Sequence, residues 1–197
     1  MKILITGFDP FNKADINPSY EAVRLLPDAI DNKEITKLLI PTSFKRSFEV
    51  LKDNLDENKY DAIILVGQAG GRVGISLEKV AINYMDATIA DNDGFVAKDS
   101  IIYPNEREAY FSTLPLIEMR DELINNKISA HISYSAGTFV CNYLMYNTLM
   151  YFKETSVMAG FIHVPFSDIQ ASKLDNKYYS MTISEIARAL ELAIKAI

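Results

Sequence analysis

Short apolar runs alternate along the chain with segments whose apolar residues recur at helical spacing. Ile75–Tyr84 has a partly alternating pattern and is predicted to be extended. Residues 86–108 are rich in Asp, Asn, Gly and Lys and are expected to form a long loop or lobe. Five apolar runs have the length and composition of buried strands: Lys2–Thr6, Ile35–Ile40, Asp61–Val66, Ile128–Tyr134 and Val157–Val164.

Helical periodicity is clearest in Ser43–Asn58, where the apolar residues recur at spacings of four, three and four. An earlier helix is expected to have Asn17 as its cap and Pro18 at its first position. It should end at about Leu26, where Pro27 prevents its continuation. Three further helices are predicted: Leu114–Asn126, Phe139–Phe152 and Thr182–Ile197.

The alternation of strands and helices predicts one α/β domain over residues 1–197, with a largely parallel sheet and helices on both faces. The chain length of 197 residues suits a single domain. In such sheets ligands bind outside the carboxyl ends of the strands. Candidate chemistry is therefore expected in the loops that follow Thr6, Ile40, Val66, Tyr134 and Val164.

Composition narrows the possible functions. The chain has 20 Lys and Arg against 26 Asp and Glu, a formal net charge of −6, so we expect no nucleic-acid partner. No apolar stretch approaches the ~20 residues of a membrane span, and the N-terminus lacks the pattern of a signal peptide, so no membrane partner is expected. A single cysteine suits a reducing, cytoplasmic location. With only two histidines, a His-rich metal centre is not expected.

The lone cysteine, Cys141, allows two interpretations. Free cysteine is among the most buried residue types, so this residue could be structural. Its position favours chemistry, because it falls near the first turn of a predicted helix that follows a strand and a Gly-containing turn. Unpaired backbone N–H groups and the positive end of the helix dipole would favour a thiolate there and could stabilise an oxyanion.

His163 is the candidate base for this thiol. It lies at the end of a predicted strand, 22 residues after Cys141, although a histidine in an apolar strand is more often a core residue. A strand–helix–strand unit of that length brings successive strand ends together, so His163 could accept the thiol proton and protonate a leaving amine. His131 begins its strand, so it is expected at the opposite edge of the sheet and is interpreted as structural.

A carboxylate should orient the imidazole, and spacing alone leaves four candidates: Glu78, Asp86, Asp91 and Asp168. Glu78 is unusual because it is embedded among apolar residues, yet it could equally face solvent on an alternating strand. The choice among the four therefore stays open at this point.

Two strand-end segments carry candidate binding residues. Residues 67–72, Gly-Gln-Ala-Gly-Gly-Arg, match neither a P-loop nor a dinucleotide-binding fingerprint, and are interpreted as a tight turn that exposes Gln68. Phe8 and Phe11 flank Pro10 after the first strand and are either core residues or an aromatic clamp.

Five segments form a combined pattern: residues 7–11 with 17–19 (Gly-Phe-Asp-Pro-Phe and Asn-Pro-Ser), 67–72, 78–83 (Glu-Lys-Val-Ala-Ile-Asn), 135–142 and 160–165 (Gly-Phe-Ile-His-Val-Pro). In this order and spacing they resemble the pyroglutamyl-peptidase I (pyrrolidone-carboxylate peptidase) family of cysteine peptidases. The pattern covers nearly the whole chain, and five segments in register are specific although each is weak alone. The resemblance implies a three-layer αβα sandwich around a mostly parallel, mixed and twisted sheet.

The resemblance also implies an activity, namely removal of an N-terminal pyroglutamyl (5-oxoproline) residue from peptides through a thioester, without a cofactor. It assigns Cys141 as the nucleophile, His163 as the general base and acid, and Glu78 as the group that orients His163. It further implies homo-oligomers, either dimers or tetramers.

The same resemblance implies a substrate pocket in which Phe8 and Phe11 hold the 5-oxoproline ring, Gln68 hydrogen-bonds the lactam and Thr42 lines the wall. This agrees with the chemistry of the ring, which is uncharged, has apolar faces and carries one donor and one acceptor on its lactam edge. A charged N-terminus would lose its solvation in such a pocket without gaining a partner.

The chain departs from the family pattern at several positions. Asn12-Lys13 stands where Gly-Gly is usual, Thr88 where an Arg is usual and Ala90 where a Pro is usual. The loop at 93–108 also lacks the usual Gln-Pro and Gly-Pro elements. Two alternatives therefore stay open: specificity for another small acyl amide, and a catalytically weak protein that binds pyroglutamyl peptides.

Overall fold

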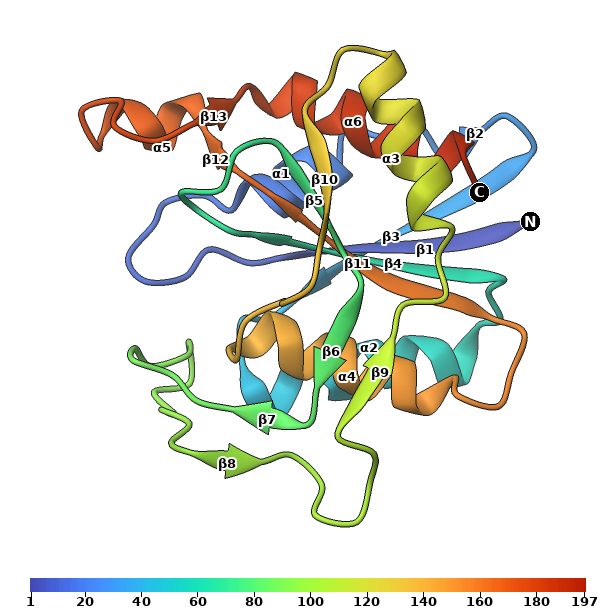
Figure 1. The fold of residues 1–197 in the computed structure, drawn as a ribbon, viewed down its shortest axis with the longest axis vertical. Helices are drawn as coiled ribbons and strands as arrows, with labels where there is room; N and C mark the ends of the chain where they lie inside the picture. Colours follow the sequence, from blue (N-terminus) through green and yellow to red (C-terminus); the bar gives the residue numbers. More distant parts are fainter.

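A seven-stranded sheet, covered by helices on both faces, organises the computed structural model, which describes residues 1–197 (Figure 1). The strand order is β10-β5-β11-β4-β1-β3-β2. These strands are β1 (Lys2–Phe8), β2 (Ala29–Ile30), β3 (Lys33–Ile40), β4 (Ala62–Gln68), β5 (Ile75–Glu78), β10 (Ala130–Ser133) and β11 (Met158–Val164). The expected α/β fold with three layers is confirmed.

Helices α1, α3 and α6 lie on one face of the sheet, and α2 and α4 lie on the other (Figure 1). Five helices match predicted ones: α1 (Pro18–Val23), α2 (Phe44–Glu57), α3 (Leu116–Asn125), α4 (Val140–Tyr151) and α6 (Ile183–Lys195). A short helix, α5 (Asp168–Ser172), has no counterpart among the predicted elements. Three small two-stranded sheets complete the fold: β12 (Phe166–Ser167) with β13 (Ser180–Met181), β6 (Val80–Ile82) with β9 (Ala109–Phe111), and β7 (Tyr84–Met85) with β8 (Ser100–Ile101).

The helices begin where the sequence provides capping groups. The side chain of Asn17 accepts a hydrogen bond from the Ser19 N–H at 3.1 Å, and Pro18 occupies the first position of α1. At the start of α2, Ser43 Oγ accepts from the Arg46 N–H at 3.0 Å. Each cap satisfies a backbone donor that has no partner inside the helix. These two helix starts are therefore as expected, although α1 ends three residues before the predicted end.

Strand β1 shows how the core is divided. Ile3 and Ile5 face the cluster formed with α1, α3 and α6, whereas Leu4 and Phe8 face the cluster formed with α2 and α4. Alternate side chains of a strand point to opposite faces, so a central strand covered on both sides must be apolar throughout. The short apolar run at the start of the chain is therefore explained by its central place in the sheet.

The sheet is mixed, and the predicted strand that ends at Tyr134 therefore runs in the opposite direction to the one that ends at Val164. Strand β5 lies between β10 and β11 and runs antiparallel to β11, while β10 runs parallel to β5. Strand β10 is consequently antiparallel to β11, and the expectation that Tyr134 and Val164 end strands at the same edge is wrong. The predicted extended stretch Ile75–Tyr84 is also divided, into β5, β6 and the start of β7, which belong to three different sheets.

Candidate active site

A cavity of about 170 Å³ opens at the carboxyl ends of β1, β4 and β11, the edge where a ligand site was expected. Six of the seven predicted site residues line it: Phe8, Phe11, Thr42, Gln68, Cys141 and His163. Cavities of about 150 Å³ can bind a single small ring such as benzene. This one is therefore matched in size to one small cyclic group.

Cys141 is the second residue of α4. Phe139, at the cap position just before α4, makes no capping hydrogen bond through its side chain. The backbone N–H groups of Val140, Cys141 and Asn142 have no acceptor in the protein. The start of α4 therefore offers unpaired donors beside the sulfur, as oxyanion stabilisation requires.

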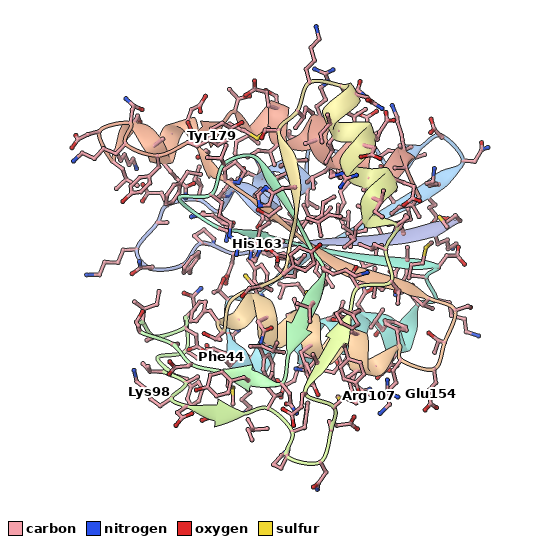
Figure 2. The ribbon with its side chains drawn as sticks, viewed as in Figure 1. Phe44, Lys98, Arg107, Glu154, His163 and Tyr179 are labelled. Atoms are coloured by element: carbon pink, nitrogen blue, oxygen red, sulfur yellow. The ribbon has the colours of Figure 1, made fainter.

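The sulfur of Cys141 lies against the backbone of Gly67, the sixth residue of β4. A methyl group added at Gly67 would come within 3.0 Å of Sγ and 2.7 Å of Cζ of Phe161. Gly67 is also the register partner of His163 in β11, and neighbouring strands lie about 4.8 Å apart. The sulfur therefore lies over β4, beside the strand that carries His163. Figure 2 shows His163 near the middle of the molecule, between the two helical layers.

Glu78 is the carboxylate that contacts His163. Its Oε1 is 2.7 Å from Nδ1 of His163, and the Glu78 side chain is fully buried. Nε2 of His163 has no protein partner, and the residue lines the cavity. A carboxylate that accepts from Nδ1–H leaves Nε2 as the basic nitrogen on the cavity side. The geometry excludes the surface-facing alternative for Glu78.

The three competing carboxylates have other surroundings. Asp91 is buried and accepts hydrogen bonds from backbone N–H groups, including that of Phe44 at 2.9 Å. Asp86 accepts from the Asp99 N–H at 3.2 Å, and Asp168 is exposed at the start of α5. None of the three contacts His163.

Arg72 also lines the cavity, and the sequence analysis did not single it out. Its Nη1 donates to Glu78 Oε1 at 2.5 Å and to Ser133 Oγ at 3.3 Å, and its Nη2 donates to the Ser135 carbonyl at 2.9 Å. One guanidinium therefore ties the turn after β4 to the end of β10 and to the buried carboxylate. Its place in the Gly-Gly-Arg turn is the only sequence signal for this role.

The charges of this group shift its pKa values. Burial alone would raise the pKa of Glu78, but the hydrogen bond and charge of His163, with Ser133 and Arg72, hold it below its ordinary value. Burial lowers the pKa of His163, against the opposing effect of Glu78. Both shifts favour a resting state in which Glu78 is ionised and His163 is neutral.

Burial also raises the pKa of the Cys141 thiol to about 12; the charge of Glu78 adds to this shift and that of Arg72 opposes it. Burial therefore opposes the thiolate that the start of the helix was expected to favour. The resting state pairs a neutral thiol with a neutral imidazole.

Two aromatic side chains of the cavity wall, Phe11 and Phe139, form a tilted pair. The ring centroids of Phe11 and Phe139 are 6.1 Å apart at an interplanar angle of 38°. Phe8 is almost fully buried and packs on Phe161, so it forms part of the inner wall. Phe139 was not predicted as a site residue, and its position two residues before Cys141 is the signal that could have identified it.

Gln68 and Thr42 supply polar groups to the cavity wall. Oε1 of Gln170 accepts a hydrogen bond from the Ser167 N–H, which orients the Gln170 amide. Nε2 of Gln170 therefore faces Gln68 and donates to Oε1 of Gln68 at 2.9 Å. This orientation leaves the NH₂ group of Gln68 without a protein acceptor. Thr42 Oγ1 donates to the Asp9 carbonyl at 3.2 Å and keeps its lone pairs available.

The departures from the family pattern lie outside this cavity. Asn12 and Lys13 have φ values of 50° and 62°, the left-handed region that favours the glycines usual there. Thr88 and Ala90 are exposed and do not line the cavity. His131 is exposed, and its Nε2 lies 3.2 Å from Ser76 Oγ. Because β10 is antiparallel to β11, His131 lies in the register row of His163 rather than at the opposite edge.

No group of three or more His, Cys, Asp and Glu side chains has a geometry that could hold a metal ion. None of the helices combines the length and apolar character that crossing a membrane requires.

Comparison with known proteins agrees with this geometry. Residues 1–197 match the family model described as pyroglutamyl peptidase. Pyrrolidone-carboxylate peptidase from Brachyspira hyodysenteriae is 50% identical over 197 residues, covering 99% of this chain and 98% of the relative. That from Clostridium perfringens is 47% identical over 199 residues, covering 100% and 93%. The crystal structure of pyroglutamyl peptidase I from Bacillus amyloliquefaciens superposes with a TM-score of 0.94 at 38% identity, covering 99% of this chain and 93% of that one.

Proposed function

Because this chain belongs to the pyroglutamyl peptidase family, we propose that Cys141 is its nucleophile, His163 its general base and acid, and Glu78 the group that orients His163. The protein is a cysteine peptidase of the pyroglutamyl-peptidase I type, and its substrates are peptides with an N-terminal pyroglutamyl residue. The observation that carries the assignment is that Cys141 and His163 line one cavity while the buried Glu78 carboxylate holds Nδ1 of His163 and leaves its Nε2 free.

The resting thiol is neutral, so attack and proton transfer belong to one step. As Sγ bonds to the carbonyl carbon of the pyroglutamyl residue, Nε2 of His163 takes the thiol proton. The unpaired N–H groups at the start of α4 stabilise the oxyanion. The imidazolium, held by Glu78, then protonates the departing amine, and a thioester remains. Water, activated by Nε2, hydrolyses the thioester and restores the thiol.

The rings of Phe11 and Phe139 hold the two faces of the 5-oxoproline ring. A flat group between two rings needs contacts of about 3.5 Å on each side, or roughly 7 Å in total. The centroids are 6.1 Å apart, so the rings must separate by about 1 Å when substrate enters. The NH₂ group of Gln68 donates to the lactam carbonyl, and Thr42 Oγ1 accepts from the lactam N–H.

Turnover of pyroglutamyl, prolyl and glutaminyl amides by the same preparation tests this function. We expect only the pyroglutamyl amide to be cleaved at an appreciable rate, and we expect Cys141→Ala to abolish cleavage while the protein stays folded. Equal rates on the three amides would favour an altered specificity, and parental turnover by Cys141→Ala would contradict the mechanism.

Self-association into dimers or tetramers and a cytoplasmic location stay predictions. Sedimentation of the purified protein and fractionation of cells that produce it test the two predictions.

A further inference from the structure

A second cavity, of about 380 Å³, lies beside the first and shares two of its walls. Phe11 and Gln68 line both cavities. The second cavity runs between the loop that follows β1 and helix α5, two segments at the same end of the molecule (Figure 1). We call it the outer groove.

A hydrogen-bonded framework holds the walls of the outer groove in place. Gln170 of α5 donates through Nε2 to the Ile16 carbonyl at 3.2 Å and to Gln68 Oε1 at 2.9 Å. The same side chain forms a capping box with Ser167 at the start of α5. One residue therefore joins α5, the loop and the active-site wall, so the groove is a built feature that borders the catalytic cavity.

The surface of the groove combines apolar side chains with one unpaired cation. Ile169 is 58% exposed and Leu174 is 40% exposed, although both are large apolar residues. Lys173 pairs with Asp15 across the rim. Lys13 also lines the groove and forms no salt bridge. Exposed apolar residues beside a free cation suit a ligand with an apolar part and a carboxylate.

We propose that the outer groove binds the part of the substrate that leaves as the free amine, and so selects the residue after the pyroglutamyl group. A large apolar side chain at that residue contacts Ile169 and Leu174, and a carboxylate that follows it lies near Lys13. The proposal rests on the proposed function, since it needs the 5-oxoproline ring beside Phe11. The preferred substrates are then short pyroglutamyl peptides with a large apolar second residue and a free C-terminal carboxylate.

Three substrates separate the contributions: pyroglutamyl-glycinamide, pyroglutamyl-leucinamide and pyroglutamyl-leucine. The parent should cleave the leucinamide with a kcat/KM about tenfold higher than that for the glycinamide. A factor of about ten is what a small apolar contact contributes to specificity in a binding site. The free acid should exceed the leucinamide by about threefold at low salt, and this advantage should disappear at high salt.

Matched variants complete the test. Ile169→Ser should reduce the leucinamide preference about threefold or more, whereas Ile117→Ser, at a site on α3 with 57% exposure, should leave it unchanged. Lys13→Gln should remove the advantage of the free acid, whereas Lys59→Gln, at an exposed and unpaired lysine outside the groove, should not. Unchanged preferences in Ile169→Ser and Lys13→Gln overturn the proposal. A parent that fails to cleave even the glycinamide would instead contradict the proposed function.

Discussion

Replacing Gly67 with alanine tests whether the nucleophile lies where the structure places it. The added methyl group would be 3.0 Å from Sγ of Cys141 and 2.7 Å from Cζ of Phe161. Ordinary contacts between such atoms are about 3.5–4.0 Å, so the sulfur must move by roughly 0.5–1 Å and the ring by roughly 0.8–1.3 Å. Both atoms belong to the packed layer between the sheet and α4, which resists such movement.

Two effects of different size follow from this displacement. Misplacement of a reacting atom by about 1 Å can cost about 100-fold in rate, so we expect kcat to fall by roughly tenfold to 100-fold. Overpacking of a core typically costs about 1–3 kcal/mol of unfolding free energy, of which the lower chain entropy of alanine in the unfolded state offsets part. The variant should therefore fold, and its loss of rate should exceed what the loss of stability explains.

The assay combines steady-state turnover, alkylation of Cys141 by iodoacetamide and urea unfolding. Gly160→Ala in the neighbouring strand β11 is the matched control, because its methyl group would meet Ser112 Oγ at 2.3 Å and Leu114 Cδ1 at 2.7 Å, away from Cys141. Both variants should lose stability, but only Gly67→Ala should lose kcat and change the alkylation rate. Parental kcat and alkylation in a folded Gly67→Ala variant would refute the placement of the sulfur above β4.

The remaining predictions concern the charges behind the cavity. Glu78→Gln should lower kcat/KM about 100-fold, because it removes a charge-assisted hydrogen bond to His163 worth about 3 kcal/mol. The same variant should speed alkylation of Cys141 at pH 8, because the charge of the carboxylate contributes to the raised pKa of the thiol. Arg72→Met should slow both turnover and alkylation, since the guanidinium lowers the thiol pKa; faster alkylation would contradict this. Burial holds the pKa of His163 below 6.5, so folded protein resists a protonation that the unfolded chain accepts. Stability should therefore fall as the pH drops below about 6.5, and urea unfolding of His163→Gln should show a smaller drop between pH 7 and 5.

The long elements could be predicted because each satisfies a local rule. The five apolar runs correspond to strands β1, β3, β4, β10 and β11, and the caps Asn17 and Ser43 begin the expected helices. The direction of β5 could not be predicted in this way. A strand of four residues has the same alternation in either direction, and its orientation is decided by pairing with β11, which is distant in sequence. Helix α5, with five residues, is too short for periodicity to reveal it.

The reversal of β5 also explains why the support of His163 could be predicted only in part. In the antiparallel register Ser76 pairs with His163, and Glu78 pairs with Phe161, two residues deeper along β11. A parallel β5 would carry Glu78 outward past His163, towards the mouth of the cavity and into water. The reversal buries the carboxylate behind the imidazole, so it contacts Nδ1 and leaves Nε2 on the substrate side. It also brings Arg72, at the turn before β5, within reach of this carboxylate, so a residue that local rules assign to an exposed turn becomes part of the catalytic support.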